Sequence, residues 1–260
     1  MMKAVIFVQA IYLLILTATS HAQETIRITN GEWEPFLSQH SPHYGINSHI
    51  VSEAFGLEGI QVKWGFFPWK RAFIEARDNN QWDASAAWGV TKEVEEDFLV
   101  SAPISTNSYV FFHLKSRSFD WSGFEDLQGH TIGVTLQYDY GKEFLSAMKT
   151  QSFGVDWAVS DETNFKKLLG GRIDIFPNDL TVGYAQIRNT FPPEQAQHFT
   201  HHAKEFRRRT LHLIISKSSP HARTFLERFN SGLEKLKESG QLAEMMRDLK
   251  SGKYDRTASP

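Results

Sequence analysis

The sequence contains no cysteine among its 260 residues. This absence excludes disulfide bonds, thiol nucleophiles, zinc ribbons and iron–sulfur clusters. An excess of charge is also missing, because 28 Lys and Arg residues stand against 30 Asp and Glu residues and the net charge is −2. Proteins that bind nucleic acid carry a basic footprint, so we expect no nucleic-acid partner.

Long apolar runs are missing after the first 22 residues, so no later segment is expected to span a bilayer. The first 22 residues combine Lys3, an apolar run over 4–16 and the small-residue sequence Ser20-His21-Ala22. This order is typical of a secretory signal peptide, with a membrane anchor as the alternative. We therefore predict a signal peptide at residues 1–22 and a periplasmic mature protein.

Known catalytic motifs are also missing. The sequence holds no Gly-x-Ser-x-Gly elbow, no His-Glu-x-x-His pair and no phosphate-binding glycine loop. His198, His201, His202 and His212 match no metal-ligand spacing, so we expect a solvated loop there rather than a metal site. We expect no cofactor and no enzyme activity.

What is present is a regular alternation of strand and helix patterns, in a chain that is 13% aromatic. Strands are predicted at 25–29, 60–66, 83–88, 108–114, 131–134, 154–159, 174–176 and 211–215, and helices at 44–55, 68–76, 140–149, 162–169, 180–187, 222–236 and 242–249. The alternation predicts an α/β fold with mostly parallel strands. Two alternating blocks and a late return of the chain suggest two lobes.

Five segments, taken in order, resemble one known family. The first is Glu32-Trp33-Glu34-Pro35-Phe36, an aromatic, a spacer, a proline and an aromatic. The others are 45–55, 68–72 with 83–84, 101–104, and 126–134 with 171–174. Together they cover nearly all of residues 23–252. They resemble the bacterial extracellular solute-binding proteins of family 3, the polar amino acid receptors of ABC importers.

The resemblance implies a two-lobe periplasmic-binding-protein fold, in which two α/β lobes are joined by two hinge crossings. Lobe one would comprise 23–106 plus 211–260, and lobe two 107–210. A monomer would capture a small polar solute between the lobes and deliver it to an ABC permease in the inner membrane. Two alternatives stay open, because the fold also carries enzymes and sensors. They are an enzyme similar to the periplasmic cyclohexadienyl dehydratases and a sensor binding protein without a transporter.

The candidate ligand-binding residues come partly from the resemblance and partly from residue chemistry. They are Trp33, Trp69, Arg71, Ala87, Trp88, Gly89, Thr91, Thr135, Leu136, Gln137 and Asp179. The resemblance places Trp33 over the ligand and Asp179 on its amine. Core packing is the alternative for Trp33, and an N-cap is the alternative for Asp179, which precedes a predicted helix.

Val94 stands where the family has the Arg that binds the ligand carboxylate. Arg71, at a predicted helix start, is the residue that can replace it, with a surface turn as the alternative. Without such a cation, Asp179 in an aromatic cleft favours an amine ligand, and standard α-amino acids are expected to bind poorly. The basic run 207–209 is expected to be solvated or to pair with lobe-one carboxylates.

Overall fold

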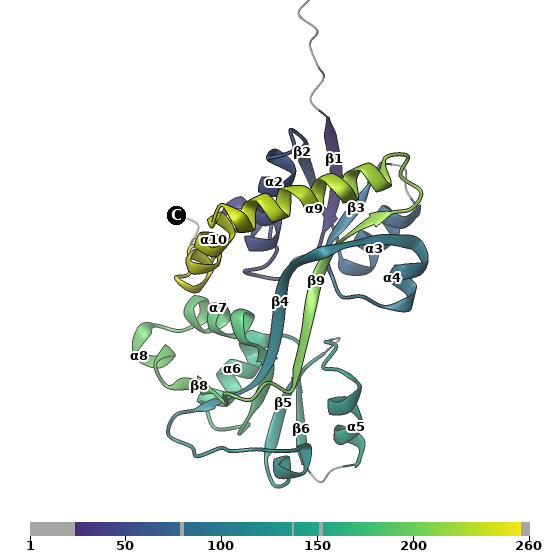
Figure 1. Cartoon of the computed structure of the whole chain (residues 1–260). Coiled ribbons are helices and arrows are strands. Elements are labelled where there is room, and N and C mark those ends of the chain that lie inside the picture. Colours follow the sequence, from purple (N-terminus) through teal and green to yellow (C-terminus); the bar gives the residue numbers. More distant parts are fainter. Residues whose placement is uncertain (1–23, 79–80, 137, 151–152, 256–260) are drawn as a thin grey trace, which may run out of the picture.

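Two long strands, β4 (Phe98–Leu114) and β9 (Arg207–Ser216), carry the chain between the two halves of the molecule (Figure 1). The computed structural model describes residues 24–78, 81–136, 138–150 and 153–255. The predicted signal peptide at 1–22 lies outside this part. We call the half with the N-terminal strand lobe one and the other half lobe two. The predicted lobe boundaries, after residues 106 and 210, fall inside β4 and β9, and they stay a prediction.

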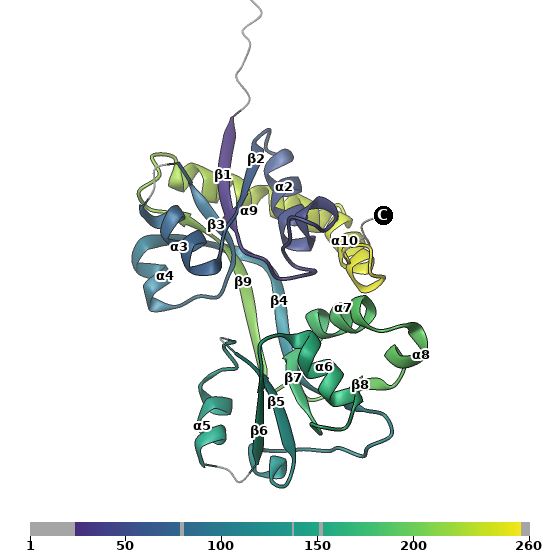
Figure 2. The same cartoon turned by 180° about the vertical axis from the view of Figure 1, so that it is seen from behind.

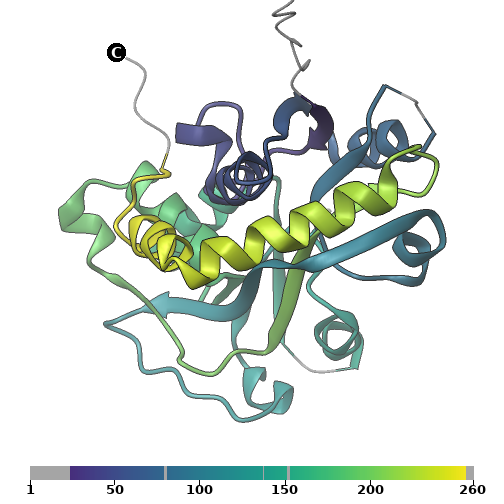
Figure 3. The same cartoon turned by 45° about the horizontal axis from the view of Figure 1, so that its top comes forward.

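Lobe one contains both ends of the described chain. Its elements are β1 (Thr25–Asn30), the 3₁₀ helix η1 (Pro42–Tyr44), α2 (Ile46–Gly56), β2 (Gln61–Phe66), α3 (Trp69–Asp78), β3 (Ala84–Trp88), α4 (Lys92–Asp97), α9 (Ala222–Glu238) and α10 (Gln241–Lys250). Strand β1 pairs in parallel with β2 and β3. The long amphipathic helix α9 lies across this lobe (Figure 3). Its apolar face, predicted from Ala222 to Leu236, is buried except for Leu226, which is partly buried.

Lobe two is built from the middle of the chain. Its elements are η2 (Phe124–Leu127), β5 (Thr131–Thr135), α5 (Lys142–Thr150), β6 (Gly154–Ala158), α6 (Asp161–Leu169), β7 (Phe176–Asp179), α7 (Leu180–Thr190), α8 (Pro193–Ala196) and β8 (Phe199–His201). Strands β5 and β6 pair in parallel, and the bridge between Ile132 and Ile175 joins β5 to the segment before β7. Strand β7, predicted at 174–176, begins at Phe176, two residues later than expected.

The prediction of mostly parallel strands is wrong for the large sheet. Its order is β2-β1-β3-β9-β4-β7, with β8 also on β4. Strand β9 is antiparallel to both β3 and β4, and β4 is antiparallel to β7 and β8. The reason is topological: the chain leaves lobe one in β4 and returns beside it in β9, so the two strands must run in opposite directions.

Each lobe has its own apolar core. In lobe one, a large cluster lies between the strands and α2, α9 and α10, and a smaller one contains Phe73, Val94 and Phe98. Lobe two has two clusters rich in Phe and Tyr. Val182, from α7 of lobe two, is buried in the large cluster of lobe one. Helix α7 therefore contacts both lobes, next to α10 (Figure 2).

No helix in the described ranges combines the length and the apolar character that a bilayer crossing needs.

Candidate functional site

Strand β3 is irregular where the family-like ligand segment lies. Between Ser85 and Trp88 it holds one residue more than the facing part of β9, which is a β-bulge. Within the bulge, Ala87 has a φ of 63°, a left-handed conformation that side chains disfavour. Such strain persists where the surrounding structure enforces it, and it is frequent at binding sites. The candidate residues Ala87, Trp88 and Gly89 therefore lie at a bend that the tertiary structure imposes.

An aromatic cluster lies beside this bend. The rings of Trp69 and Trp88 meet edge to face with centroids 5.4 Å apart, and Phe73 meets Trp88 at 5.1 Å. The Trp69 ring covers Gly31 so closely that a Cβ there would lie 2.4 Å from it, so only glycine fits. Trp88 Nε1 donates to Ser85 Oγ over 2.7 Å. The structure thus brings two of the candidate tryptophans together.

The third tryptophan, Trp33, is half-buried against the large core cluster of lobe one, with its ring 4.9 Å from that of Phe36. This is the position that the core-packing alternative describes, while a role over the ligand stays a prediction.

Thr91, Val94 and Arg71 belong to α3 and α4 or cap them, and these helices contribute Phe73 and Val94 to lobe one's small core. Thr91 caps α4, since its Oγ1 accepts from Val94 N over 3.2 Å. Val94 is buried in the apolar cluster with Phe73 and Phe98. The Arg71 side chain is 63% exposed and its Nε donates to Glu75 over 3.1 Å. A surface position, the alternative for Arg71, is therefore the one that this structure shows.

In lobe two, Thr135 ends β5 inside a buried polar network. Its Oγ1 donates to Asp161 over 2.7 Å and accepts from Asn164 Nδ2 over 3.0 Å. Tyr138 Oη also donates to Asp161, and burial raises the pKa of that carboxyl. The neighbouring Leu136 is 46% exposed, and Gln137 lies outside the described residues.

Asp179 ends β7, where α7 begins, and only 1% of it is exposed. Its Oδ1 accepts from the backbone N–H groups of Thr181 and Val182 over 2.9 and 3.0 Å, and its Oδ2 accepts from Ser108 N over 2.9 Å. The predicted N-cap is therefore present. Burial raises the pKa of Asp179 to about 6, although these N–H groups and the charge of Arg209 oppose the rise.

The arginines of the basic run 207–209 have ion-pair partners that the sequence did not predict. Arg208 is exposed and pairs with Glu205. Arg207 and Arg209, on the other face of β9, both approach Asp139 of lobe two, with Nη–Oδ2 distances of 2.7 and 3.6 Å. The expectation of a solvated run is wrong for these two, because strand alternation turns them inward. Their partner carboxylate belongs to lobe two, not to lobe one.

Arg209 also approaches lobe one. Its Nη1 lies 3.5 Å from the position that a Cβ on Gly89 would take. We use the name crossing site for Gly89, Asn107, Asp139, Asp179 and Arg209, which meet where β4 and β9 pass between the lobes. Arg209 therefore brings a cation close to the ligand segment, and it is a residue that the sequence reasoning did not select as a candidate.

The expected solvated histidine loop is likewise only partly present. His201 lies in β8 with its Nδ1 2.7 Å from Tyr184 Oη. His212 is buried in β9, where its Nδ1 contacts Ser101 O and its Nε2 contacts Thr210 Oγ1, both over 2.7 Å. Within the ranges that the structure describes, no three His, Cys, Asp or Glu side chains form a metal-ligand cluster.

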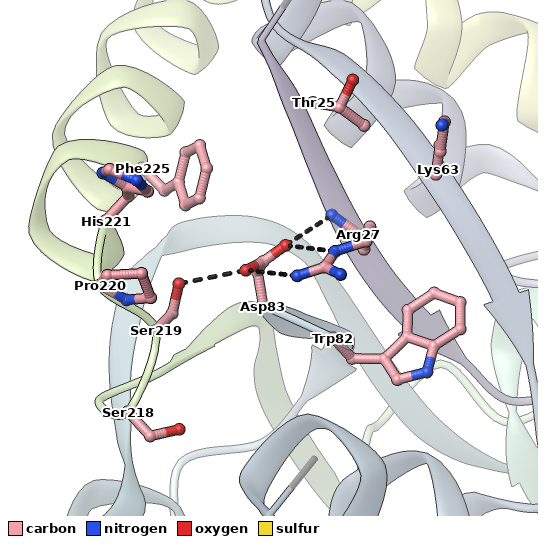
Figure 4. Close-up of a pocket in the computed structure, with 10 residues that line it drawn as sticks. All are labelled: Thr25, Arg27, Lys63, Trp82, Asp83, Ser218, Ser219, Pro220, His221 and Phe225. Carbon is pink, nitrogen blue, oxygen red and sulfur yellow. Dashed lines mark hydrogen bonds and ion pairs between the residues drawn. The ribbon is translucent and has the colours of Figure 1, made fainter. Parts of the chain in front are cut away.

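A separate pocket of about 520 Å³ lies in lobe one (Figure 4). Asp83 is at its centre, where it accepts from Arg27 Nε over 3.2 Å and from Ser219 Oγ over 3.2 Å. Trp82, His221 and Phe225 also line it. None of the candidate ligand-binding residues lines this pocket.

Comparison with known proteins identifies the family. The family model described as bacterial extracellular solute-binding proteins, family 3, matches residues 26–255. No curated protein matches the chain.

Solved structures share the fold at low sequence identity. Substrate-binding domain 2 of GlnP from Lactococcus lactis, in an open conformation, is 17% identical with a TM-score of 0.68, covering 92% of this chain and 98% of its own. The second substrate-binding domain of a putative amino acid ABC transporter from Streptococcus pneumoniae is 18% identical with a TM-score of 0.69, covering 89% and 100%. The GluR0 ligand-binding core from Nostoc punctiforme, in complex with L-glutamate, is 19% identical with a TM-score of 0.62, covering 89% and 100%. The fold is therefore that of two-lobe periplasmic binding proteins.

Proposed function

Because the chain belongs to the bacterial extracellular solute-binding proteins of family 3, we propose that it captures a small polar solute between its two lobes. The observation that carries this proposal is the crossing site. There, Arg209 of β9 lies within 3.6 Å of Asp139 in lobe two and beside Gly89 in lobe one. A solute bound at this position would contact both lobes and favour their closure around it.

The binding surface that we propose has one wall from each lobe. Trp69, Trp88 and Gly89 form the wall of lobe one, with Trp33, Ala87 and Thr91 as further candidates. Thr135, Leu136 and Asp179 form the wall of lobe two, and Gln137 stays a candidate from the sequence alone. The tryptophan faces supply apolar contact, and Arg209 with the strand backbones supplies the polar partners.

We propose that the protein works as an exported monomer that delivers its solute to an ABC permease. Two neighbours that share its fold are substrate-binding domains, one of them from an amino acid ABC transporter. Export would follow from the predicted signal peptide at residues 1–22. A permease and ATPase gene pair beside this gene would support import, whereas an adjacent sensor gene alone would favour the sensor alternative.

Calorimetric and thermal-shift titration of residues 23–260 tests the receptor function, with amino acids, amines, sugars and small acids as probes. A solute at 100 times its Kd raises the free energy of unfolding by about 2.7 kcal/mol, which a melting curve detects. Small-angle scattering with the bound solute should then show a smaller radius of gyration. Failure of every class of probe to bind the folded protein would contradict the proposal.

One observation favours a second candidate, an enzyme similar to the cyclohexadienyl dehydratases. Asp179 is a buried acid with a raised pKa, and Arg209 lies close enough to lower that pKa. Such an enzyme needs an acid for proton transfer and arginines for substrate carboxylates. Both Asp179 oxygens already accept backbone N–H groups, however, which favours binding. Turnover of a cyclohexadienyl substrate, abolished in Asp179→Asn, would establish the enzyme.

A further inference from the structure

Strand pairing aims Arg209 into the region between the lobes. In the antiparallel ladder of β4 and β9, Asn107 stands opposite Arg209, and Ser108 stands opposite Arg208. Paired residues point to the same face and successive residues to opposite faces. Arg209 and Asn107 therefore share one face, while Arg208 points away and pairs with Glu205 in solvent.

The guanidinium of Arg209 keeps its donors available. Its contact with Asp139 Oδ2 is 3.6 Å, too long for a hydrogen bond, whereas Arg207 Nη2 reaches the same oxygen at 2.7 Å. Within the described part of the chain, the side chain of Arg209 makes no hydrogen bond, and its Nε is buried without a partner. A buried charged donor without an acceptor raises the free energy of the folded protein. An acceptor from outside the chain would therefore bind this group favourably.

A second, independent observation lies directly across the ladder. Asn107 is 1% exposed, and both its Nδ2 and its Oδ1 are buried without a partner in the described structure. Buried side-chain amides are normally hydrogen-bonded, so two orphan atoms at this position also indicate a missing partner. One amide and one guanidinium on the same face present several donors and one acceptor.

Gly89 leaves room for that partner. A Cβ at this position would lie 3.5 Å from Arg209 Nη1, in ordinary contact, so any larger side chain would cover the guanidinium. Glycine leaves this side of the guanidinium uncovered. Planar carboxylates match the planar guanidinium with two parallel hydrogen bonds.

We infer that Arg209, from the returning strand, binds the carboxylate of a small organic acid or amino acid, next to Asn107 and Gly89. This inference rests on the proposed receptor function and specifies its ligand. Arg209 performs the anion-binding role that Val94 cannot perform, because the valine side chain has no charge and no hydrogen-bond donor and packs in an apolar cluster. Asp139 holds Arg207 and lies near Arg209 in this structure, so an incoming carboxylate competes with Asp139 for the second arginine.

The test uses matched probes that differ only in the carboxylate. Each of L-lysine, L-arginine, L-histidine and L-tryptophan is titrated beside its decarboxylated amine, and succinate and propionate are added as acids without an amine. We expect the wild-type protein to bind carboxylates of this panel and to bind the paired amines at least about tenfold more weakly.

Variants then locate the carboxylate. Arg209→Gln should weaken binding of the best acid roughly 10- to 100-fold, and Arg209→Lys should fall between the two because it keeps charge but loses the planar fork. Arg208→Gln is the matched control, expected within about twofold of the wild type because Arg208 points into solvent. Unchanged melting curves without ligand show that each variant folds.

Two outcomes would overturn the inference and leave the receptor function intact: amines that bind as tightly as their parent acids, or Arg209→Gln with the affinity of Arg208→Gln. Absence of binding by every probe to the folded wild type would contradict the receptor function and the inference together. Asp139→Asn provides a further readout, because removal of the competing carboxylate should increase affinity for the best acid several-fold.

Discussion

The guanidinium of Arg188 in α7 donates two hydrogen bonds to Asp255, from Nε over 2.5 Å and from Nη2 over 3.0 Å. Asp255 follows the buried Tyr254, whose Oη lies 2.7 Å from Nδ1 of His49 in α2. The segment after α10 is therefore fixed to lobe one and reaches lobe two at the end of α7. This ion pair connects the lobes at a point separate from the two crossing strands.

We expect Arg188 and Asp255 to contribute a small but measurable coupling to stability. The Arg188 side chain is 40% exposed, so solvent screens the pair, and a coupling energy of about 0.5–1 kcal/mol is expected. A double-mutant cycle with Arg188→Ala and Asp255→Ala, followed by urea denaturation, measures it. Additive effects of the two substitutions would show that the pair contributes nothing.

Asp179 should make the stability of the protein depend on pH. Its pKa is about 6 in the folded protein and near 3.8 when unfolded, so the folded state holds the proton more tightly. The stability that protonation adds is complete below pH 3.8 and is lost as the pH rises through 6, with a total of about 3 kcal/mol. Asp179→Asn should remove this dependence.

The measurement for Asp179 is the free energy of unfolding of wild type and variant at intervals from pH 4 to pH 8. The difference between them should decrease by up to about 3 kcal/mol across this range. The matched control is Glu238→Gln, which removes an exposed carboxylate in α9. A wild-type profile parallel to that of Asp179→Asn would show that the buried carboxyl does not titrate there.

Two neighbouring alanines in β3 should respond differently to substitution by glycine. Ala87 has a φ of 63°, where glycine avoids a steric cost of about 1–2 kcal/mol. Ala86 is buried in the same strand without a positive φ, so glycine there costs about 0.5–1 kcal/mol in chain entropy. Chemical denaturation should find Ala87→Gly at least about 1 kcal/mol more stable than Ala86→Gly. Equal stabilities would argue against strain at the bulge.

The contact between α2 and α9 depends on a glycine. A Cβ at Gly232 would lie 1.9 Å from the carbonyl oxygen of Ala54, which is backbone and cannot turn away. Gly232→Ala should therefore separate the helices and lower the free energy of unfolding by about 2–4 kcal/mol. Gly56→Ala is the control, because nothing lies within 4 Å of its Cβ position, and it should be neutral or up to about 1 kcal/mol stabilising. A mild effect at Gly232 would contradict the close packing.

Much of the secondary structure was predictable because its signals are local. The apolar stripe of α9 and the alternation in β1 depend on neighbours within a few residues. The first ten residues of β4 were not predicted as a strand, since Pro103 and several hydroxyl residues interrupt the apolar pattern. Their extended conformation depends on hydrogen bonds to β9, more than a hundred residues further along the chain.

The sequence by itself determined the α/β alternation and the family, because ordered motifs and residue periodicity are properties of short segments. It also indicated the N-cap at Asp179, which depends on the helix that follows directly. Only the tertiary structure decided that Arg207 and Arg209 turn inward and that, within the described residues, Arg209 keeps its side-chain donors without hydrogen-bond partners. That choice depends on the register of Asn107 against Arg209 and on the approach of Gly89 and Asp139, all from distant parts of the chain. No local sequence pattern encodes contacts between such distant residues, because side-chain direction in a strand reverses with a shift of one residue in register.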